Sequence, residues 1–188
     1  PAGIVQDPNT GAVFISEQQA STGYWEQSYG STIHCVDEPF NGALVSFFAG
    51  SADGSGYSDN EVLNSQFNNP SGLAVHNGFL YIADSGNHVI RRIGLDASTP
   101  CLATSNVETI AGIPMTRGYL DDDGRSAVQA YLNNPTALAI NSQGDIYIAD
   151  TDNNRVRRIA ADTQTINTVA GHGTLLGTQS SAALYTDL

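Results

Sequence analysis

The chain has 188 residues, of which 40% are hydrophobic, so it is long enough to bury the core of one domain. No apolar stretch in the sequence approaches the length of a membrane-spanning helix. The formal charge is −12, lysine is absent and only 14% of the residues are charged. This balance excludes nucleic acid as a partner.

The surface composition favours an extracellular or cell-surface location. Polar surface positions that are usually Lys or Glu are instead expected to be Ser, Thr, Asn or Gly, as in many secreted proteins. Asn69 and Asn134 are each followed by Pro, so neither is an N-glycosylation acceptor and any glycan would be O-linked. The sequence begins without a Met or a signal peptide, so we expect a processed product or a part of something longer.

In chain order, the first predicted strands lie at residues 1–5, 12–17 and 33–36. They form a degraded copy of a unit that recurs at residues 70–93 and 135–159, where Asn-Pro, Ala-Asp and Arg-Arg pairs stand at matching positions. Each copy then closes on an Ala-Gly pair. The sequence therefore predicts one domain of three repeats, approximately at residues 1–69, 70–134 and 135–188.

Within the second copy, short apolar or alternating runs predict four strands, at residues 73–75, 80–83, 89–93 and 107–111. Repeated four-stranded antiparallel units are the blades of a β-propeller, an all-β fold that hides its sheet edges by radial repetition. Helix is expected only as short turns at residues 60–67, 125–132 and 181–188.

Two segments carry a resemblance to a known family: LAVHNGFLYIADSGNHVIRRI at residues 73–93 and LAINSQGDIYIADTDNNRVRRI at residues 138–159. With their TIAG or TVAG endings and the Gly-Tyr-x-Asp-like segments that follow, they resemble the NHL-repeat family. The resemblance implies a propeller, commonly six-bladed, that serves as a binding or scaffolding platform and occasionally as an enzyme. The first copy departs from the pattern, with Glu17 in place of the Asp and no Arg pair. We therefore expect three four-stranded antiparallel blades, either half of a six-bladed ring or an open assembly unit.

The most conspicuous polar residues have a structural interpretation. Asp84 and Asp150 end the second strand of their copies and begin Asp-Ser/Thr-x-Asn turns, where a carboxylate can accept backbone N–H groups and cap the hairpin. Asn87 and Asn153 are expected to supply the unusual backbone angles of these turns.

Two arginine pairs follow in the third strands, Arg91 with Arg92 and Arg157 with Arg158. Neighbouring residues of a strand point to opposite faces. An Arg packed between blades and paired with a carboxylate would explain these residues without any ligand, so we predict inter-blade polar contacts for Arg92 and Arg158.

The two cysteines, Cys35 and Cys101, fall in the third strand of the first copy and in the connector after the third strand of the second. The sequence is compatible with either an inter-blade disulfide or two free thiols. No Cys or His partners lie at metal-ligand spacing, so no structural metal is expected.

Calcium is a weaker possibility at the acidic segments 53–59 and 121–124, because Ca²⁺ prefers several oxygen ligands. Asp150-x-Asp152-x-Asn154 is similar to the start of a calcium loop, yet Arg155 stands where the sharp-turn Gly is needed. Solvated turns are the favoured interpretation, and no cofactor is expected.

Catalysis is not indicated. The four histidines occupy different phases of the repeat and do not converge: His34, His76, His88 and His172. No Ser-His-Asp or Cys-His arrangement can be assembled.

The most individual feature of the first copy is an insertion that carries Tyr24, Trp25 and Tyr29. Aromatic side chains in a loop on a rigid scaffold are common binding elements. We predict a protein or glycan contact here, with a lid that packs on its own blade as the equal alternative.

Three blades cannot close a ring, and an open propeller leaves two strand edges ready to pair. We therefore predict a non-enzymatic extracellular structural module that self-assembles or adheres. Its partners would be other copies of itself or further blades of a longer chain, in a closed ring or a head-to-tail filament. The alternative is a ligand-binding or metal-dependent catalytic sector, similar to a lyase or lactonase, of a larger six-bladed propeller.

Overall fold

The computed structural model describes residues 1–18, 31–37, 45–51, 54–99, 101–103, 105–119 and 123–171. In this part of the chain the regular structure consists of antiparallel strands and four three-residue 3₁₀ turns. The all-β prediction is confirmed.

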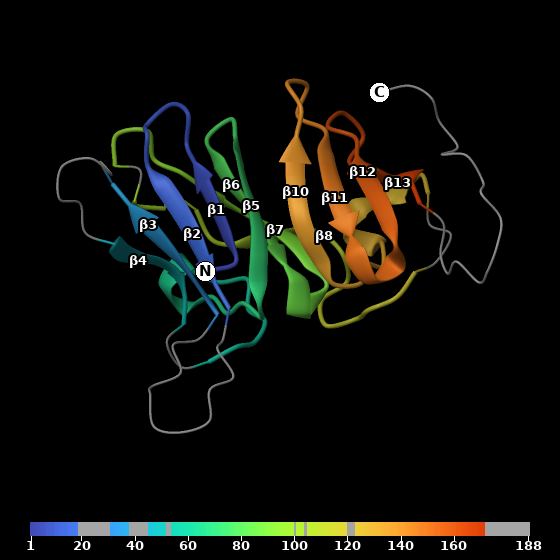
Figure 1. Cartoon of the computed structure of the whole chain (residues 1–188), viewed down its shortest axis with the longest axis horizontal. Coiled ribbons are helices and arrows are strands. Elements are labelled where there is room, and N and C mark those ends of the chain that lie inside the picture. Colours follow the sequence, from blue (N-terminus) through green and yellow to red (C-terminus); the bar gives the residue numbers. More distant parts are fainter. Residues whose placement is uncertain are drawn as a thin grey trace.

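Three sheets follow one another along the chain, and their first strands meet in the middle of the array (Figure 1). Blade 1 contains β1 (Gly3–Gln6), β2 (Val13–Glu17), β3 (Thr32–Val36) and β4 (Val45–Gly50). Blade 2 contains β5 (Pro70–His76), β6 (Phe79–Asp84), β7 (Val89–Gly94) and β8 (Glu108–Ala111). Blade 3 contains β10 (Pro135–Ile140), β11 (Ile146–Asp150), β12 (Arg155–Ile159) and β13 (Thr165–Ala170), with β9 (Arg125–Ser126) paired to its outer edge.

Each blade is an up-and-down meander in which consecutive strands pair with each other. The β5–β6 hairpin is the tightest, with only Asn77 and Gly78 between the paired residues His76 and Phe79. Both turn residues have positive φ, 47° and 74°. Asn-Gly in this conformation is the preferred two-residue hairpin turn, so the local sequence fixes the register of blade 2.

The predicted helical turns are shorter than expected. Only Val62–Asn64 (η1) and Ala127–Gln129 (η3) are 3₁₀ turns in the first two predicted segments, and residues 181–188 lie outside the described part of the chain. The two other 3₁₀ turns, η2 (Ser85–Asn87) and η4 (Thr151–Asn153), begin directly after the Asp that ends β6 and β11.

The core lies between the blades. Phe14 of blade 1 and Leu80 and Ile82 of blade 2 belong to one buried cluster, while Tyr81 and Ala83 belong to a second cluster with blade 3. Successive residues of β6 therefore pack against different blades. Since blade 2 is covered on both faces, β6 is apolar throughout until Asp84, rather than alternating between apolar and polar.

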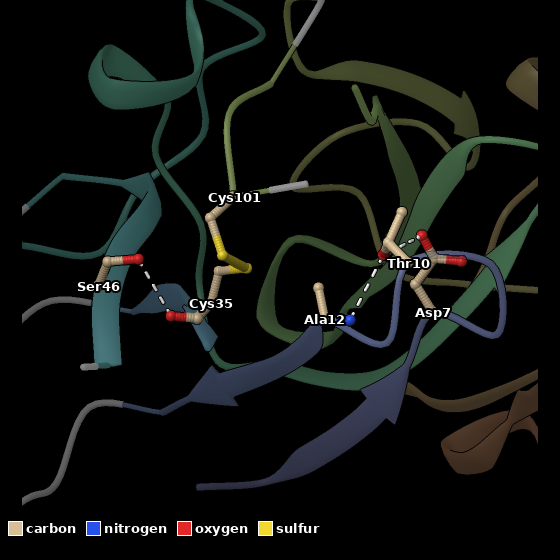
Figure 2. The surroundings of a disulfide bond; sticks show 6 residues. All are labelled: Asp7, Thr10, Ala12, Cys35, Ser46 and Cys101. Carbon is tan, nitrogen blue, oxygen red and sulfur yellow. Dashed lines mark hydrogen bonds between the residues drawn. A yellow bond between two sulfur atoms is a disulfide. The ribbon is translucent and has the colours of Figure 1, made fainter. Parts of the chain in front are cut away.

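A disulfide joins blade 1 to blade 2 (Figure 2). The sulfur atoms of Cys35 in β3 and Cys101 in the β7–β8 connector are 2.04 Å apart, and the two residues are 66 positions apart in the sequence. Of the two alternatives that the sequence leaves open, the structure contains the inter-blade disulfide.

Steric constraints explain why each copy ends with a glycine. Gly50, Gly112 and Gly171 have φ values of 115°, 90° and 89°, which side chains rarely adopt. A Cβ atom on Gly112 would lie 2.4 Å from the carbonyl oxygen of His88, at the start of the neighbouring strand. The end of β8 can therefore come this close to the start of β7 only with Gly at position 112.

Replacement of Gly112 by Ala is expected to lower the free energy of unfolding by about 2 kcal/mol, because it adds a backbone clash to the conformational strain. Gly78→Ala is the control, since Gly78 also has a positive φ but no atom of the described residues lies within 4 Å of the position that its Cβ would occupy. Urea unfolding measures both. Equal losses for the two variants would contradict the steric explanation.

Candidate functional site

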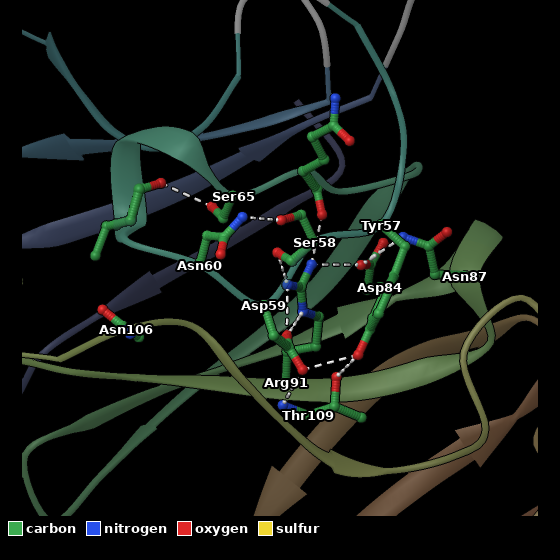
Figure 3. A network of polar contacts seen from close by, with 12 residues as sticks. Tyr57, Ser58, Asp59, Asn60, Ser65, Asp84, Asn87, Arg91, Asn106 and Thr109 are labelled. Atoms are coloured by element: carbon green, nitrogen blue, oxygen red, sulfur yellow. Dashed lines mark hydrogen bonds and ion pairs between the residues drawn. The ribbon is translucent and has the colours of Figure 1, made fainter.

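Asp84 is the centre of a buried polar network in blade 2 (Figure 3). Its Oδ1 accepts the Asn68 backbone N–H at 2.8 Å, and its Oδ2 accepts the Asn87 side-chain amide at 2.8 Å and the Arg91 guanidinium at 3.1 Å. Burial raises the pKa of the Asp84 carboxyl to about 6, while Arg91 and the other donors oppose that rise. The carboxylate thus connects the segment before β5, the η2 turn and β7.

Arg91 is fully buried and connects β7 to the segment before blade 2. Its guanidinium donates to Asp59 Oδ1 at 2.7 Å and to the Gln66 carbonyl at 2.6 Å. The rings of Phe67 and Tyr57 lie over the guanidinium, with centroids 4.6 and 5.1 Å from its central carbon. A buried charge is tolerated when it is paired and hydrogen-bonded in this way.

Blade 3 repeats this network. Asp150 Oδ1 accepts the Asn133 backbone N–H at 2.7 Å and Oδ2 accepts the Asn153 amide at 2.8 Å. The buried Arg157 lies 3.8 Å from Asp150 and 3.5 Å from Asp123. Because the same arrangement occurs in two blades, we interpret it as the support of the blade rather than as a ligand site.

Blade 1 carries a reduced form of the network. Pairing of Ile15 with His34 matches pairing of Ile82 with Arg91, so His34 stands where blade 2 has its buried Arg. His34 Nε2 lies 3.3 Å from the carboxylate of Glu17, and both side chains are partly exposed. The departure of the first copy from the repeat pattern therefore replaces a buried Arg–Asp ion pair with a partly solvated His–Glu contact.

The predicted roles of the turn asparagines need correction. The residues with left-handed angles are His88 (φ 60°) and Asn154 (φ 53°), one position after Asn87 and Asn153. Asn87 and Asn153 instead donate their amides to the carboxylate and to the Gly56 or Gly118 carbonyl.

The aspartates do not cap the hairpin turns either. Neither Asp84 nor Asp150 makes a side-chain cap hydrogen bond to the 3₁₀ turn that follows it. Each accepts the N–H of a residue that precedes the first strand of its blade.

The prediction of inter-blade polar contacts for Arg92 and Arg158 is also wrong. Arg92 pairs with Glu108, and Arg158 pairs with Asp145 at 2.8 Å, each within its own blade. The Ala161 N–H, together with Arg158, holds the pKa of Asp145 below its ordinary value. The deeply buried arginines are their neighbours, Arg91 and Arg157.

The outer face of blade 1 is largely apolar, and no blade packs against it in the part of the chain that the structure describes. One row across the sheet consists of Ile4, Ile15, His34 and Phe47, in paired register. Ile4 is 71% exposed and Phe47 is 41% exposed. At the position of Ile15, blade 2 has Ile82, which is fully buried against blade 1.

The outer face of blade 3, at the other end of the array, is also partly exposed. Tyr147 and Ala149 of blade 3 are equivalent to Tyr81 and Ala83 of blade 2. In blade 2 these two residues are buried by contact with blade 3. In blade 3 both residues are only partly buried, and the neighbouring Val156 is exposed. We call these two surfaces the open faces of blades 1 and 3.

Other predicted site residues lie outside the described ranges. These are Tyr24, Trp25 and Tyr29 of the insertion, with His172, Asp53, Asp121 and Asp122. The contact predicted for the insertion stays a prediction. Of the acidic residues that are described, Asp59 and Asp123 pair with the buried arginines. Within the described ranges, no group of three or more His, Cys, Asp or Glu side chains could hold a metal ion, and no helix is long and apolar enough to cross a membrane.

Comparison with known proteins identifies the repeat. The family model described as the NHL repeat matches residues 67–93 and 132–159. These matches cover the first three strands of blades 2 and 3, apart from the last residue of β7, and they include Asp84, Arg91, Asp150 and Arg157 of the networks.

Three curated relatives illustrate the range of proteins that contain a similar sequence. The Arabidopsis thaliana protein SUPPRESSOR OF QUENCHING 1, chloroplastic, is 32% identical over 85% of this chain and 14% of its own length. Human NHL repeat-containing protein 2 is 33% identical over 47% of this chain and 11% of its own length. Human teneurin-4 is 34% identical over 51% of this chain and 4% of its own length. The chain thus spans a small part of each of these relatives.

Solved structures share the fold at lower identity. A Bacteroides thetaiotaomicron protein of unknown function aligns over 88% of this chain and 34% of its own, with 19% identity and a TM-score of 0.60. An auxiliary nutrient binding protein from the same organism aligns over 92% of this chain and 36% of its own, with 17% identity and a TM-score of 0.61. Both are longer chains of which this one matches about a third.

Proposed function

Because this chain is an NHL-repeat β-propeller segment, we propose that it is a non-enzymatic structural and interaction module that works by packing further blades against its two open faces. The observation that carries the proposal is the exposure of the same positions that form the interfaces within the chain. Ile82 and Tyr81 are buried between blades, while their equivalents Ile15 and Tyr147 face outward at the two ends of the array.

The open faces suit each other as partners. Inside the chain, the face that contains Phe14 packs on the face that contains Leu80 and Ile82. The face of blade 3 that contains Tyr147 is equivalent to the first kind, and the face of blade 1 that contains Ile15 is equivalent to the second. A head-to-tail contact between two copies would therefore repeat an interface that the chain already makes twice.

The partner of each open face is a second copy of this chain or the next blades of a longer polypeptide. Exposed apolar faces of this kind mark interaction surfaces in soluble proteins. Two copies that meet at both ends form a six-bladed ring, and a contact that does not close gives a filament.

We place the module outside the cell, either secreted or at the cell surface. The disulfide between Cys35 and Cys101 supports this location, because such bonds persist in oxidising compartments. The lysine-free, Ser- and Thr-rich composition supports it as well. Glycans and extracellular proteins are the further partners that fit this environment.

The assembly proposal is tested by light scattering of the full chain over a range of concentrations. We expect particles of two or more chains of 19.8 kDa each. Ile4→Asp, which places a charge on the open face of blade 1, is expected to shift the mass toward a single chain. Met115→Asp is the matched control, because Met115 is 72% exposed and Ile4 is 71% exposed, but Met115 lies in the connector after β8.

Two results would contradict the proposal. The first is a single-chain mass for the unmodified protein at every concentration. The second is an equal response of the mass to Ile4→Asp and Met115→Asp, since a general effect of surface charge would act on both.

A further inference from the structure

A pocket of about 250 Å³ lies between blades 2 and 3. Blade 2 contributes His76 and Phe79 from the β5–β6 hairpin and Arg92 from β7. Blade 3 contributes Gln143 from the β10–β11 turn and Gln164 from the β12–β13 turn. The pocket is built entirely within this chain, so it does not depend on the assembly proposed above.

The equivalent place between blades 1 and 2 is occupied by the disulfide. Cys35 pairs with Phe14 in the same register in which Arg92 pairs with Tyr81, so Cys35 and Arg92 occupy equivalent positions. Cys101 comes from the connector between the third and fourth strands, as Gln164 does in the next blade. One interface is thus bridged by a covalent bond at this place, and the other holds a pocket lined by both polar and apolar side chains.

The lining has the chemistry of an anion site. Arg92 and His76 are the lining residues that can carry positive charge, and none of the lining residues is acidic in a chain whose formal charge is −12. Arg92 is held in place by the pair with Glu108 and by the Phe79 ring, whose centroid is 4.7 Å from the guanidinium carbon. Glu108 pairs with Nε of this guanidinium, so a ligand carboxylate would bind its other N–H donors.

The histidine supplies a second, independent observation. His76 Nε2 is buried and has no hydrogen-bond partner among the described residues. A buried polar atom without a partner costs about 1–3 kcal/mol and requires an explanation. Since this atom exposes less than 1 Å², a small movement of the ring toward the pocket would let a ligand hydroxyl group become its partner.

We propose that this inter-blade pocket binds a small hydroxylated carboxylate, such as a sugar acid. Arg92 pairs with the carboxylate, while His76 and the amides of Gln143 and Gln164 bind hydroxyl groups. The volume is slightly below the range of about 300–1,000 Å³ that accommodates drug-sized ligands, so a single sugar ring is the size that fits. The source is a free sugar acid or the terminal residue of an acidic glycan.

Calorimetric titration of the full chain with sodium galacturonate tests the site, with glucose and acetate as the matched neutral and non-hydroxylated probes. Galacturonate is expected to bind, and glucose and acetate at least tenfold more weakly. Arg92→Gln is expected to weaken galacturonate binding at least tenfold. Arg125→Gln, in the exposed strand β9 outside the pocket, is expected to leave it unchanged.

Absence of galacturonate binding at concentrations on the order of 10 mM would overturn the proposal, because it corresponds to less than about 3 kcal/mol of binding free energy. Equal binding of acetate or glucose would overturn it too, as would equal effects of the two arginine variants. Thermal melting checks that both variants are folded. A galacturonate oligomer that binds more tightly than the monomer would support the glycan as the source, and preference for the monomer would support the free acid.

Discussion

Replacement of Arg91 by Ala is expected to lower the free energy of unfolding by about 3–5 kcal/mol, because it leaves a buried carboxylate without its counterion. Asp84 is fully buried, and its remaining donors are the Asn68 N–H and the Asn87 amide. The variant also releases Asp59 and the Gln66 carbonyl, which hold the segment before blade 2 against β7.

Arg92→Ala is the matched control, since Arg92 is the next residue of the same strand and pairs with Glu108 at the surface. Exposed ion pairs contribute about 0–1 kcal/mol, so the free energy of unfolding of this variant is expected to be close to that of the unmodified protein. Urea unfolding followed by circular dichroism measures both. Similar losses for Arg91→Ala and Arg92→Ala would show that the buried network is not the source of stability.

Removal of the disulfide with the double variant Cys35→Ala and Cys101→Ala is expected to cost about 2–4 kcal/mol. The bond closes a separation of 66 residues, for which loop-closure entropy gives about 4 kcal/mol. It also fixes blade 1 to blade 2, and Cys35 itself is fully buried.

Thermal or urea unfolding with and without a reducing agent measures this contribution. The reducing agent is expected to lower the midpoint of the unmodified protein and to leave that of the double variant unchanged. If reduction left both midpoints where they are, the disulfide would have no role in stability, and its support for an extracellular location would be lost.

The repeat made the fold predictable, because a strand pattern that recurs at equal spacing has few architectures open to it. The alternation along β7 also predicts that Arg91 and Arg92 point to opposite faces. It could not predict which of them is buried, because blade 2 is covered on both faces. That answer depends on Asp59, which lies in a connector with no repeating pattern of its own.

The turn residues show how a local preference was misleading. Asn often adopts left-handed angles, which favoured Asn87 and Asn153 for that role. Their amides are instead required by the carboxylates of Asp84 and Asp150, and the next residue takes the left-handed position. The occurrence of Asn154 at that next position in the third copy was the available signal.

The disulfide and the inter-blade pocket depend on distances between blades, which strand periodicity does not contain. The repeat alignment already places Cys35 at the position of Arg92, and the strand pairing agrees with it. The bond to Cys101 and the pocket beside Arg92 are seen only once the blades are packed. The open faces are a different case. The sequence predicted two open strand edges, whereas the structure leaves open one sheet face of blade 1 and one of blade 3, because neighbouring blades pack face to face.

The most direct test of the assembly proposal is electron microscopy of the native particle, averaged until single blades are visible. We expect blades to continue beyond both open faces, as a six-bladed ring of two chains or as a head-to-tail filament. Isolated wedges of three blades, at concentrations where light scattering also gives the mass of one chain, would contradict the proposal.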